Sequence, residues 1–333
     1  MELAELMDEM LQAGKTHLVM EVSSHALDQR RTAGIPFAAG VFTNLSGDHL
    51  DYHRTMDVYL AAKRRLFESL GSDAAAVVNM DDPAGPKIAL ATAARVIGFG
   101  LEGSPELTAE VDRSDAAGTR FSLVHGAERA VVSTSLIGRH NVMNCLAAAG
   151  ACLALGVDPP VIAAALEAAG RVAGRLERVG DGEGFSVFVD YAHTDDALAN
   201  VLSALRPVCG GRLILVFGCG GDRDRSKRPR MAAAAERGAD RIVVTSDNPR
   251  SEAPSAIIED ILEGLSREAC QRAAVREDRR EAVELAIAEA AEGDIVLIAG
   301  KGHETYQETA GRRVRFDDAE AAAEALRRRR MGR

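Results

Sequence analysis

The sequence predicts an α/β protein of two domains, each built on a mostly parallel sheet. The chain has 333 residues, and domains of about 150 residues are typical, so two domains are expected. Short β-branched runs alternate with Ala-rich stretches from one end to the other, which is typical of parallel α/β architecture. Most of the expected strands are apolar throughout, so helices should cover both faces of each sheet.

The expected elements follow from these patterns in chain order. Strands are predicted over 17–22, 40–43 and 75–79 in the first half, and over 186–190, 212–217, 241–245 and 294–299 in the second. Residues 94–136 alternate polar and apolar side chains and are broken by Gly and Ser, which predicts a small antiparallel subsheet. Ala-rich helices are expected over 141–155 and 159–169. The glycines at 170 and 174 interrupt the pattern, so we expect domains 1–172 and 173–333.

Composition limits the classes of function. The hydrophobic fraction of 47% and the charged fraction of 27% are those of a globular chain. A net charge of -10 argues against a nucleic-acid partner. No segment approaches the roughly 20 apolar residues of a spanning helix, and the acidic N-terminal stretch does not resemble a secretory signal. We therefore expect a cytoplasmic protein with no membrane partner.

Two further features have structural interpretations. The cysteines show no CxxC spacing, so free thiols are expected rather than a zinc site or disulfides. They are Cys145, Cys152, Cys209, Cys219 and Cys270. The basic run 327–330 is expected to be a solvated tail at the end of a helix.

The GKT at Gly14-Lys15-Thr16 does not form a Walker A phosphate loop. That motif needs a glycine where this chain has Glu9, and it must follow a strand and begin a helix. Here a helical stretch precedes the motif and the expected strand 17–22 follows it. We interpret it as a helix end that turns into a strand.

A second glycine cluster, Gly218-Cys219-Gly220-Gly221, lies between an expected strand and a helix. Arg223 occupies the third glycine position of a dinucleotide fingerprint, so that motif matches poorly. The backbone N–H groups of such a turn can bind an anion. A carboxylate or phosphate site and a purely structural turn both remain open.

Polar residues follow the expected strands, where open parallel sheets bind ligands. In the first half, 21–25, 43–49 and 51–53 carry carboxylates and imidazoles that suit Mg²⁺, although each alone fits a structural role. In the second half, 190–193, 247–250 and 300–304 follow strands in the same way. Arg250 beside Asn248 suits a carboxylate ligand, while Asn248-Pro249 also fits an ordinary turn.

These motifs together resemble the Mur ligases, in particular the members that add meso-diaminopimelate. The matching segments are EVSSHALDQRR (21–31), FTNLSGDHLDYHRTMDVYLAAKRRLF (42–67), GRHNVMNCLAA (138–148), GRLE (174–177), VDYAHT (189–194), FGCGGDRDRSKRP (217–229), SDNPR (246–250) and AGKGHE (299–304). They run through nearly the whole chain in the family's order.

The resemblance implies a fold and a reaction. The fold is a truncated P-loop-type central domain followed by a Rossmann-like C-terminal domain. ATP, with Mg²⁺, phosphorylates the terminal carboxylate of the substrate UDP-N-acetylmuramoyl-L-alanyl-D-glutamate, and the amine of meso-diaminopimelate attacks the acyl phosphate. The family's UDP-binding domain and GTNGKT-type loop would lie upstream of Met1, so the isolated chain is expected to be inactive.

The resemblance also implies site residues. Glu21 and His49 are similar to magnesium ligands, and Lys63 resembles the lysine that becomes a metal-binding carbamate. Ser23, Gln29 and Arg31 resemble contacts to the muramoyl peptide, and Asn141, Arg175 and Asp190 resemble the nucleotide-facing set. The diaminopimelate pocket is implied to contain Arg223, Asp247, Asn248, Arg250, Gly300 and Glu304.

One departure and three alternatives accompany this assignment. Asp195 stands where the family usually has Pro, a local loop change. A non-catalytic binding protein that retains the amino-acid pocket is one alternative, and the lysine-adding relative is another. Arg250 favours diaminopimelate over lysine, because lysine has no second carboxylate. A folate- or cyanophycin-type ligase shares the fold but fits the DNPR and EVSSH motifs poorly.

Overall fold

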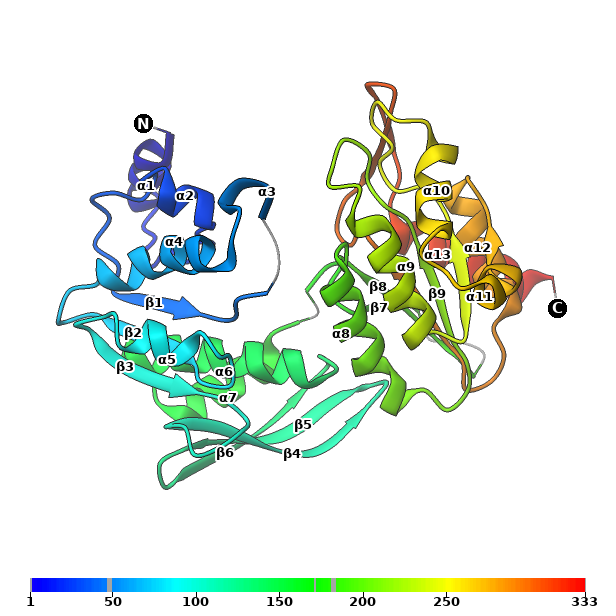
Figure 1. Cartoon of the computed structure of the whole chain (residues 1–333). Helices are drawn as coiled ribbons and strands as arrows, with labels where there is room; N and C mark the ends of the chain where they lie inside the picture. Colours follow the sequence, from blue (N-terminus) through cyan, green and yellow to red (C-terminus); the bar gives the residue numbers. More distant parts are fainter. Residues whose placement is uncertain (1, 47–49, 171, 181–183, 333) are drawn as a thin grey trace.

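The computed structural model describes residues 2–46, 50–170, 172–180 and 184–332. Two α/β units follow one another along the chain (Figure 1), each with a six-stranded sheet. We call residues up to α7 the N-terminal unit and residues from β7 onward the C-terminal unit. The predicted boundary at 172/173 lies between α7 and β7 and stays a prediction.

The sheet of the N-terminal unit has a parallel part and an antiparallel part. Its strands, in the spatial order β1 to β6, are β1 (Ala39–Phe42), β2 (Ala75–Asn79), β3 (Arg95–Phe99), β4 (Leu107–Asp115), β5 (Gly118–His125) and β6 (Glu128–Thr134). The first four pair in parallel, and β4, β5 and β6 form an antiparallel meander. The predicted antiparallel subsheet is confirmed for β4 to β6, whereas β3, which lies inside the predicted range 94–136, pairs in parallel.

Helices cover both faces of this sheet, as the apolar strands predicted. Successive side chains of a strand point to opposite faces. Ala76 and Val78 of β2 pack with α4 (Met56–Glu68) and α5 (Gly85–Ala89), whereas Val77 packs with α6 (Arg139–Ala154) and α7 (Pro159–Ala168). The two expected helices, 141–155 and 159–169, are therefore present as α6 and α7.

The predicted strand 17–22 is wrong. Helix α1 (Glu2–Gln12) ends before Gly14, but the segment that follows runs without strand structure to α2 (Ser24–Asp28), and Val19 is 95% exposed. An extended segment becomes a strand only when a neighbouring strand accepts its backbone hydrogen bonds. Within the described ranges β1 pairs with β2 alone, so 17–22 lacks that neighbour despite its apolar character.

The C-terminal unit contains a parallel sheet with one short antiparallel edge. In the spatial order β11-β10-β9-β12-β8-β7, its strands are β11 (Ala274–Val275), β10 (Arg241–Val244), β9 (Leu213–Phe217), β12 (Ile295–Ala299), β8 (Ser186–Asp190) and β7 (Glu177–Arg178). Among the strands that the structure describes in this sheet, β7 alone runs antiparallel to its neighbour. The four strands predicted for this half are confirmed as β8, β9, β10 and β12.

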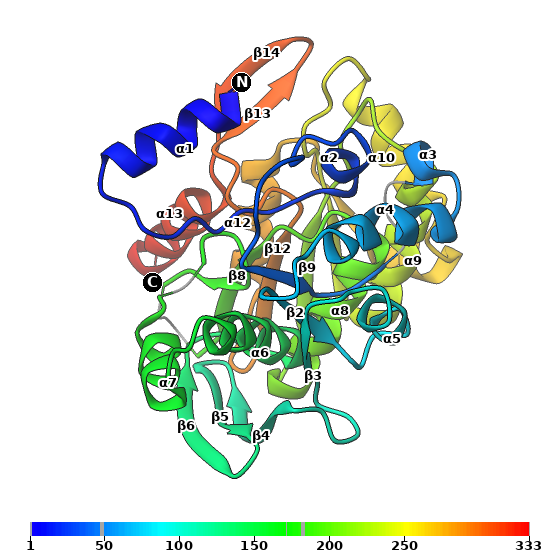
Figure 2. The same ribbon diagram turned by 90° about the vertical axis from the view of Figure 1, so that its left-hand side faces the viewer.

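Helices flank this sheet on both faces too. One core joins it to α8 (Asp195–Leu205), α9 (Lys227–Gly238), α10 (Pro254–Leu262) and α11 (Arg267–Arg272), and a second joins it to α12 (Arg279–Glu289) and α13 (Asp318–Met331). The turn η1 (Arg206–Val208) follows α8, and α3 (Leu50–His53) precedes α4 in the other unit. A separate hairpin of β13 (Tyr306–Thr309) and β14 (Arg312–Arg315) projects from the C-terminal unit (Figure 2).

The basic run 327–330 ends helix α13 and is largely exposed, as expected, but two of its arginines also bind α12. Arg329 donates to the carbonyls of Ile287 and Ala290 at the end of α12, and Arg328 pairs with Glu284 at 2.5 Å. Cations are favourable at a helix C-terminus, where carbonyls lack intrahelical partners. This run therefore holds α13 against α12. No helix in the described part of the chain has the length and apolar character of a membrane span.

A fully buried ion pair joins the first residues of α12 and α13. Arg279 donates from Nε and Nη2 to the Asp318 carboxylate at 2.8 and 2.7 Å, and neither side chain is exposed. The same guanidinium donates to the carbonyls of Ser246 at 3.2 Å and Ala299 at 3.0 Å. It thereby fixes the chain just beyond β10 and at the end of β12.

Removing one member of this pair should destabilise the protein strongly. We expect Asp318→Ala to lower the free energy of unfolding in urea by about 3–5 kcal/mol, because Arg279 would stay buried without its counter-ion. As a matched control, Glu110→Ala breaks the exposed Arg129–Glu110 pair and should change stability little, because solvent screens such a pair. Equal losses in the two variants would contradict this account.

Candidate functional site

The loop after β10 holds Arg250 in an uncommon conformation. Arg250 has a φ of 52°, in the left-handed region. The hairpin fixes it there, because Arg250 N donates to Glu308 O at 3.0 Å and Ala310 N donates to Arg250 O at 2.6 Å. Such a backbone costs about 1–3 kcal/mol and persists only where its surroundings impose it. The direction of this side chain is therefore set by the hairpin.

The Arg250 side chain lies against the glycine-rich turn. Its Nη1 donates to Gly221 O at 2.6 Å, and a Cβ added to Gly220 would lie 3.0 Å from the same nitrogen. A guanidinium has five N–H donors, and Gly221 O takes one of them. The remaining donors suit a carboxylate ligand, which guanidinium groups bind in a bidentate manner.

Asn248 and Glu304 come together from two different strand ends. Asn248 Nδ2 donates to Glu304 Oε2 at 2.8 Å. Asn248 Oδ1 accepts from Lys301 Nζ and from Glu308 N, each at 3.0 Å. Asn248 is 2% exposed and Lys301 is not exposed at all. We call Asn248, Arg250, Lys301 and Glu304 the strand-end cluster.

The close approach of the Asp247 carboxylate to the backbone of residue 300 explains why that residue is a glycine. Gly300 has a φ of 117°, and a Cβ added there would lie 2.6 Å from Asp247 Oδ2. Any larger residue would displace this buried carboxylate. Gln307 Nε2 donates to Asp247 O at 2.8 Å, which ties the same loop to the hairpin. Both residues thus shape the strand-end cluster.

Arg223 does not join that cluster. Its side chain is exposed and makes no hydrogen bond or ion pair with the residues that the structure describes. The neighbouring Asp222 instead binds the Arg250 loop, because Ser251 donates to its carboxylate from Oγ at 2.6 Å and from N at 3.1 Å. The implied place of Arg223 in the pocket stays a prediction.

The glycine-rich turn is braced from within. Gly221 N donates to Asn248 O at 2.9 Å, and Asp222 N donates to Glu252 Oε1 at 2.7 Å. Buried Arg228 binds Glu252 at 2.7 and 3.0 Å and Asp260 at 2.7 Å. Two backbone donors of the turn are therefore occupied, which favours the structural interpretation over an anion-binding loop.

The residues implied to face a nucleotide are mostly engaged with their own backbone. Asn141 Nδ2 donates to Ile137 O at 2.9 Å. The Asp190 carboxylate accepts from Leu176 N at 2.7 Å and Ala192 N at 2.8 Å, and burial raises its pKa. Arg175 is exposed, with its guanidinium 5.2 Å from the centre of the Tyr191 ring. Of these three, Arg175 has the accessible polar group.

Among the residues implied to hold metal and muramoyl peptide, the described ones lie in or next to α2 and α4, which pack together. Glu21 is exposed, and Lys63 Nζ lies 5.1 Å from the centre of the Tyr59 ring. His49 lies outside the described residues. Ser23 Oγ caps α2 by accepting from Ala26 N at 3.2 Å, whereas Gln29 and Arg31 are exposed. Within the described ranges no three His, Cys, Asp or Glu side chains form a metal-binding group.

His53 has a structural role among the residues that suggested metal binding. Its Nε2 lies 2.8 Å from Ser24 Oγ, and its ring stacks on Tyr59 at a centroid distance of 5.2 Å. It is only 3% exposed. It lies at the end of α3, and packing uses it as a core residue.

Sequence reasoning missed Lys301 and the hairpin. Lys301 stands inside the AGKGHE segment, between two residues that were selected, and its burial is invisible in the sequence. The hairpin carries Gln307 and Glu308, which bind the Asp247–Arg250 loop. The Ala310-Gly311 turn between two short polar strands was the available signal.

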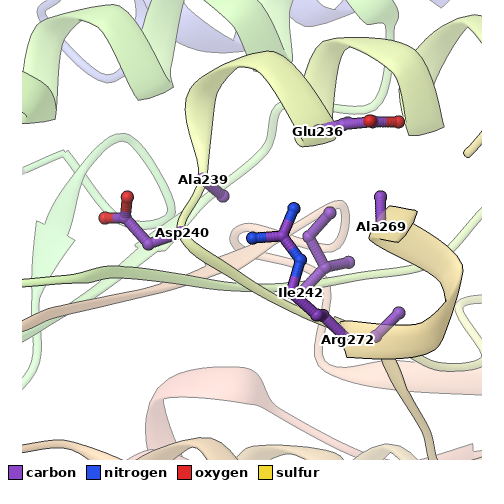
Figure 3. Close-up of a pocket in the computed structure, with 7 residues that line it drawn as sticks. Glu236, Ala239, Asp240, Ile242, Ala269 and Arg272 are labelled. Atoms are coloured by element: carbon purple, nitrogen blue, oxygen red, sulfur yellow. The ribbon is translucent and has the colours of Figure 1, made fainter. Parts of the chain in front are cut away.

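A recess between α9 and α11 lies apart from these residues (Figure 3). It is lined by Glu236, Ala239, Asp240, Ile242, Ala269, Arg272 and Ala273. Its volume of about 20 Å³ has room for roughly one water molecule. The recess is therefore too small for a substrate.

Gly221→Ala should disturb the turn. An added Cβ would lie 1.9 Å from Pro249 O, so we expect the free energy of unfolding to fall by about 1–3 kcal/mol. The matched control is Gly210→Ala, because a Cβ there meets no atom within 4 Å. That change should leave stability unchanged or raise it by about 0.4–1 kcal/mol. A neutral Gly221→Ala would show that the close approach is unimportant.

Acid should weaken the Arg228 brace. Hydrogen bonding to Arg228 lowers the pKa of Glu252 from 4.5 to about 2. A lowered carboxylate pKa contributes stability that is present above pH 4.5 and is lost as the pH falls through about 2. We expect Glu252→Gln to be less stable than the wild type at pH 7, with the difference shrinking between pH 4.5 and 2. Urea unfolding at several pH values measures this difference in the free energy of unfolding, and the exposed Glu128→Gln serves as the control. A difference between wild type and Glu252→Gln that does not change with pH would contradict the brace.

The chain matches two family models over most of its length. Residues 1–152 match the Mur ligase middle domain, and residues 174–302 match the Mur ligase, glutamate ligase domain. A UDP-N-acetylmuramoyl-L-alanyl-D-glutamate--2,6-diaminopimelate ligase from Gloeobacter violaceus is 48% identical over 99% of this chain and 67% of its own length. A ligase of the same name from Geobacillus kaustophilus is 46% identical over 96% and 67%. The chain thus spans about two thirds of the length of these relatives.

Solved structures give the same result. A UDP-N-acetylmuramoyl-L-alanyl-D-glutamate--2,6-diaminopimelate ligase shares 38% identity and a TM-score of 0.63, over 93% of this chain and 64% of that one. A folylpolyglutamate synthase from Thermotoga maritima, at 16% identity and a TM-score of 0.58 over 79% and 57%, shares the fold alone. The predicted α/β fold and the predicted relationship are both confirmed: the chain belongs to the Mur ligase family of peptidoglycan-synthesis ligases.

Proposed function

We propose that this chain carries the amino-acid-binding and metal-binding parts of a ligase that joins meso-diaminopimelate to UDP-N-acetylmuramoyl-L-alanyl-D-glutamate. The names of its relatives support the reaction. The observation that carries the choice of amino acid is the strand-end cluster, in which Asn248 binds Glu304 beyond β10 and β12, and Arg250 follows two residues later in the same loop. Ligands of open parallel sheets bind at this edge.

The cluster matches the groups of the proposed amino acid. Meso-diaminopimelate has a carboxylate and an ammonium group at each end. The Arg250 guanidinium can bind one carboxylate through its remaining donors, and the Glu304 carboxylate can accept from the ammonium at the same end. The opposite amine then remains available to attack the acyl phosphate of the peptide, form the amide bond, lose a proton and release inorganic phosphate.

ATP and Mg²⁺ belong to this proposal as cofactors. The Glu21 carboxylate is exposed and makes no hydrogen bond or ion pair with described residues, so its oxygens suit Mg²⁺. A carbamate on Lys63 would add further oxygen ligands from α4, and Arg175 could contact phosphate. Mg²⁺, when bound, neutralises charge on the transferring phosphoryl group. The roles of His49, Ser23, Gln29, Arg31, Asn141 and Asp190 are proposed on the resemblance to the family.

Arg250→Met should separate diaminopimelate from lysine as ligands. We expect the Kd for meso-diaminopimelate, measured by titration calorimetry, to rise roughly 10- to 150-fold, the loss of about 1.5–3 kcal/mol for a hydrogen bond to a charged group. The end of L-lysine opposite its α-amine has no carboxylate, so L-lysine held with its α-amine free to attack offers Arg250 no carboxylate, and its weaker binding should not change.

The control for this measurement is Arg267→Met, an exposed position on α11 in the same unit. It should bind both amino acids as the wild type does. Tighter binding of L-lysine than of meso-diaminopimelate by the wild type would identify a lysine-adding ligase instead. Binding of neither amino acid would overturn the proposed function.

A further inference from the structure

Lys301 is a fully buried lysine beside the proposed amino-acid pocket. Its side chain is 0% exposed, and lysine is rarely fully buried unless it has partners. Its Nζ donates to Asn248 Oδ1 at 3.0 Å and lies 3.4 Å from Glu304 Oε2. The Tyr306 ring centre is 5.6 Å away. All of these partners belong to the loops of the strand-end cluster and its hairpin.

These contacts determine which way the Asn248 amide faces. A lysine ammonium and a backbone N–H are donors only. Lys301 Nζ and Glu308 N both point at one atom of the amide, so that atom must be the acceptor, Oδ1. The donor Nδ2 is then left to face Glu304. A reversed amide would place its N–H groups against two donors and leave buried groups unsatisfied, which is costly.

The same contacts leave one oxygen of Glu304 available. Asn248 Nδ2 and Lys301 Nζ both donate to Glu304 Oε2. Oε1 accepts no hydrogen bond from the described residues, and the side chain is 21% exposed. A single carboxylate oxygen is thus available for a ligand donor.

We propose that Lys301 is a positioning residue that sets the specificity of the pocket for an ammonium group, by holding Asn248 and Glu304 so that Glu304 Oε1 faces the ligand. The ligand part of this inference rests on the proposed function. Without Lys301, the Asn248 amide loses one of the two donors that orient it, and Glu304 loses a neighbour that keeps Oε2 turned inward.

The first test needs no ligand. Hydrogen exchange of the Asn248 side-chain amide is followed by NMR in selectively labelled protein, with the signal assigned from its absence in Asn248→Asp. We expect Lys301→Met to exchange about tenfold faster than the wild type, the factor for one lost hydrogen bond. Backbone amides of β12 and the exposed control Lys87→Met should be unchanged. An unchanged Asn248 rate would overturn the positioning role, and faster exchange throughout β12 would show general loosening instead.

The second test is a calorimetric cycle with two ligands. Meso-diaminopimelate is compared with pimelate, which keeps both carboxylates but has no ammonium group at either end. Lys301→Met should weaken binding of meso-diaminopimelate about tenfold and leave the weaker binding of pimelate nearly unchanged. Equal losses for both ligands would overturn the specificity role.

The two tests separate this inference from the proposed function. No binding of meso-diaminopimelate by the wild type would overturn the proposed function and the ligand specificity assigned to Lys301. The exchange measurement would still decide whether Lys301 positions Asn248. Binding by the wild type together with an unchanged Lys301→Met variant would leave the proposed function intact and overturn this inference alone.

Discussion

The buried pair of Arg279 and Asp318 is the interaction on which the C-terminal unit depends. It joins the starts of α12 and α13, and Arg279 also binds the carbonyls of Ser246 and Ala299. A buried ion pair stabilises a fold only when its geometry and hydrogen bonds are complete. Here a single guanidinium holds two strand ends at a fixed separation, and the loops of the strand-end cluster begin at those ends.

Glycines let the loops of the strand-end cluster pack closely against one another. Gly220 and Gly221 let the turn after β9 lie directly against Arg250 and Pro249, and Gly300 admits the carboxylate of Asp247. The hairpin closes the group from the other side through Gln307 and Glu308. The cluster is therefore built from three stretches that are distant in sequence: the turn after β9, the loop after β10, and the chain from the end of β12 through the hairpin. None of them could hold these side chains by itself.

The sequence predicted the parts of the fold that depend on burial and periodicity. Apolar runs identified β2, β8, β9, β10 and β12 because strands buried on both faces need little else. The same signal failed at 17–22, where an apolar run has no neighbouring strand within the described ranges. Strand pairing is a property of two segments, so a single segment's composition cannot decide it.

The candidate site, like the fold, was predicted from the sequence only in part. Motif resemblance selected Asn248, Arg250 and Glu304, which the structure brings to one sheet edge. It also selected Arg223, which makes no hydrogen bond or ion pair with any of them in the described part of the chain. It passed over Lys301, because a lysine between two glycines gives no sign that it is buried. The positions of loop side chains depend on contacts from distant segments, and spacing along the chain does not contain that information.

The left-handed backbone of Arg250 has one more consequence. Because the hairpin already imposes that conformation, a ligand does not have to order this part of the loop when it binds, and less of its interaction energy is lost to conformational entropy. A guanidinium on a loop that is already ordered also stays in the pocket when the bound molecule has no carboxylate, so its N–H groups would lose water without gaining a partner. Discrimination then arises from the rejection of poorly matched molecules as much as from attraction to the correct one.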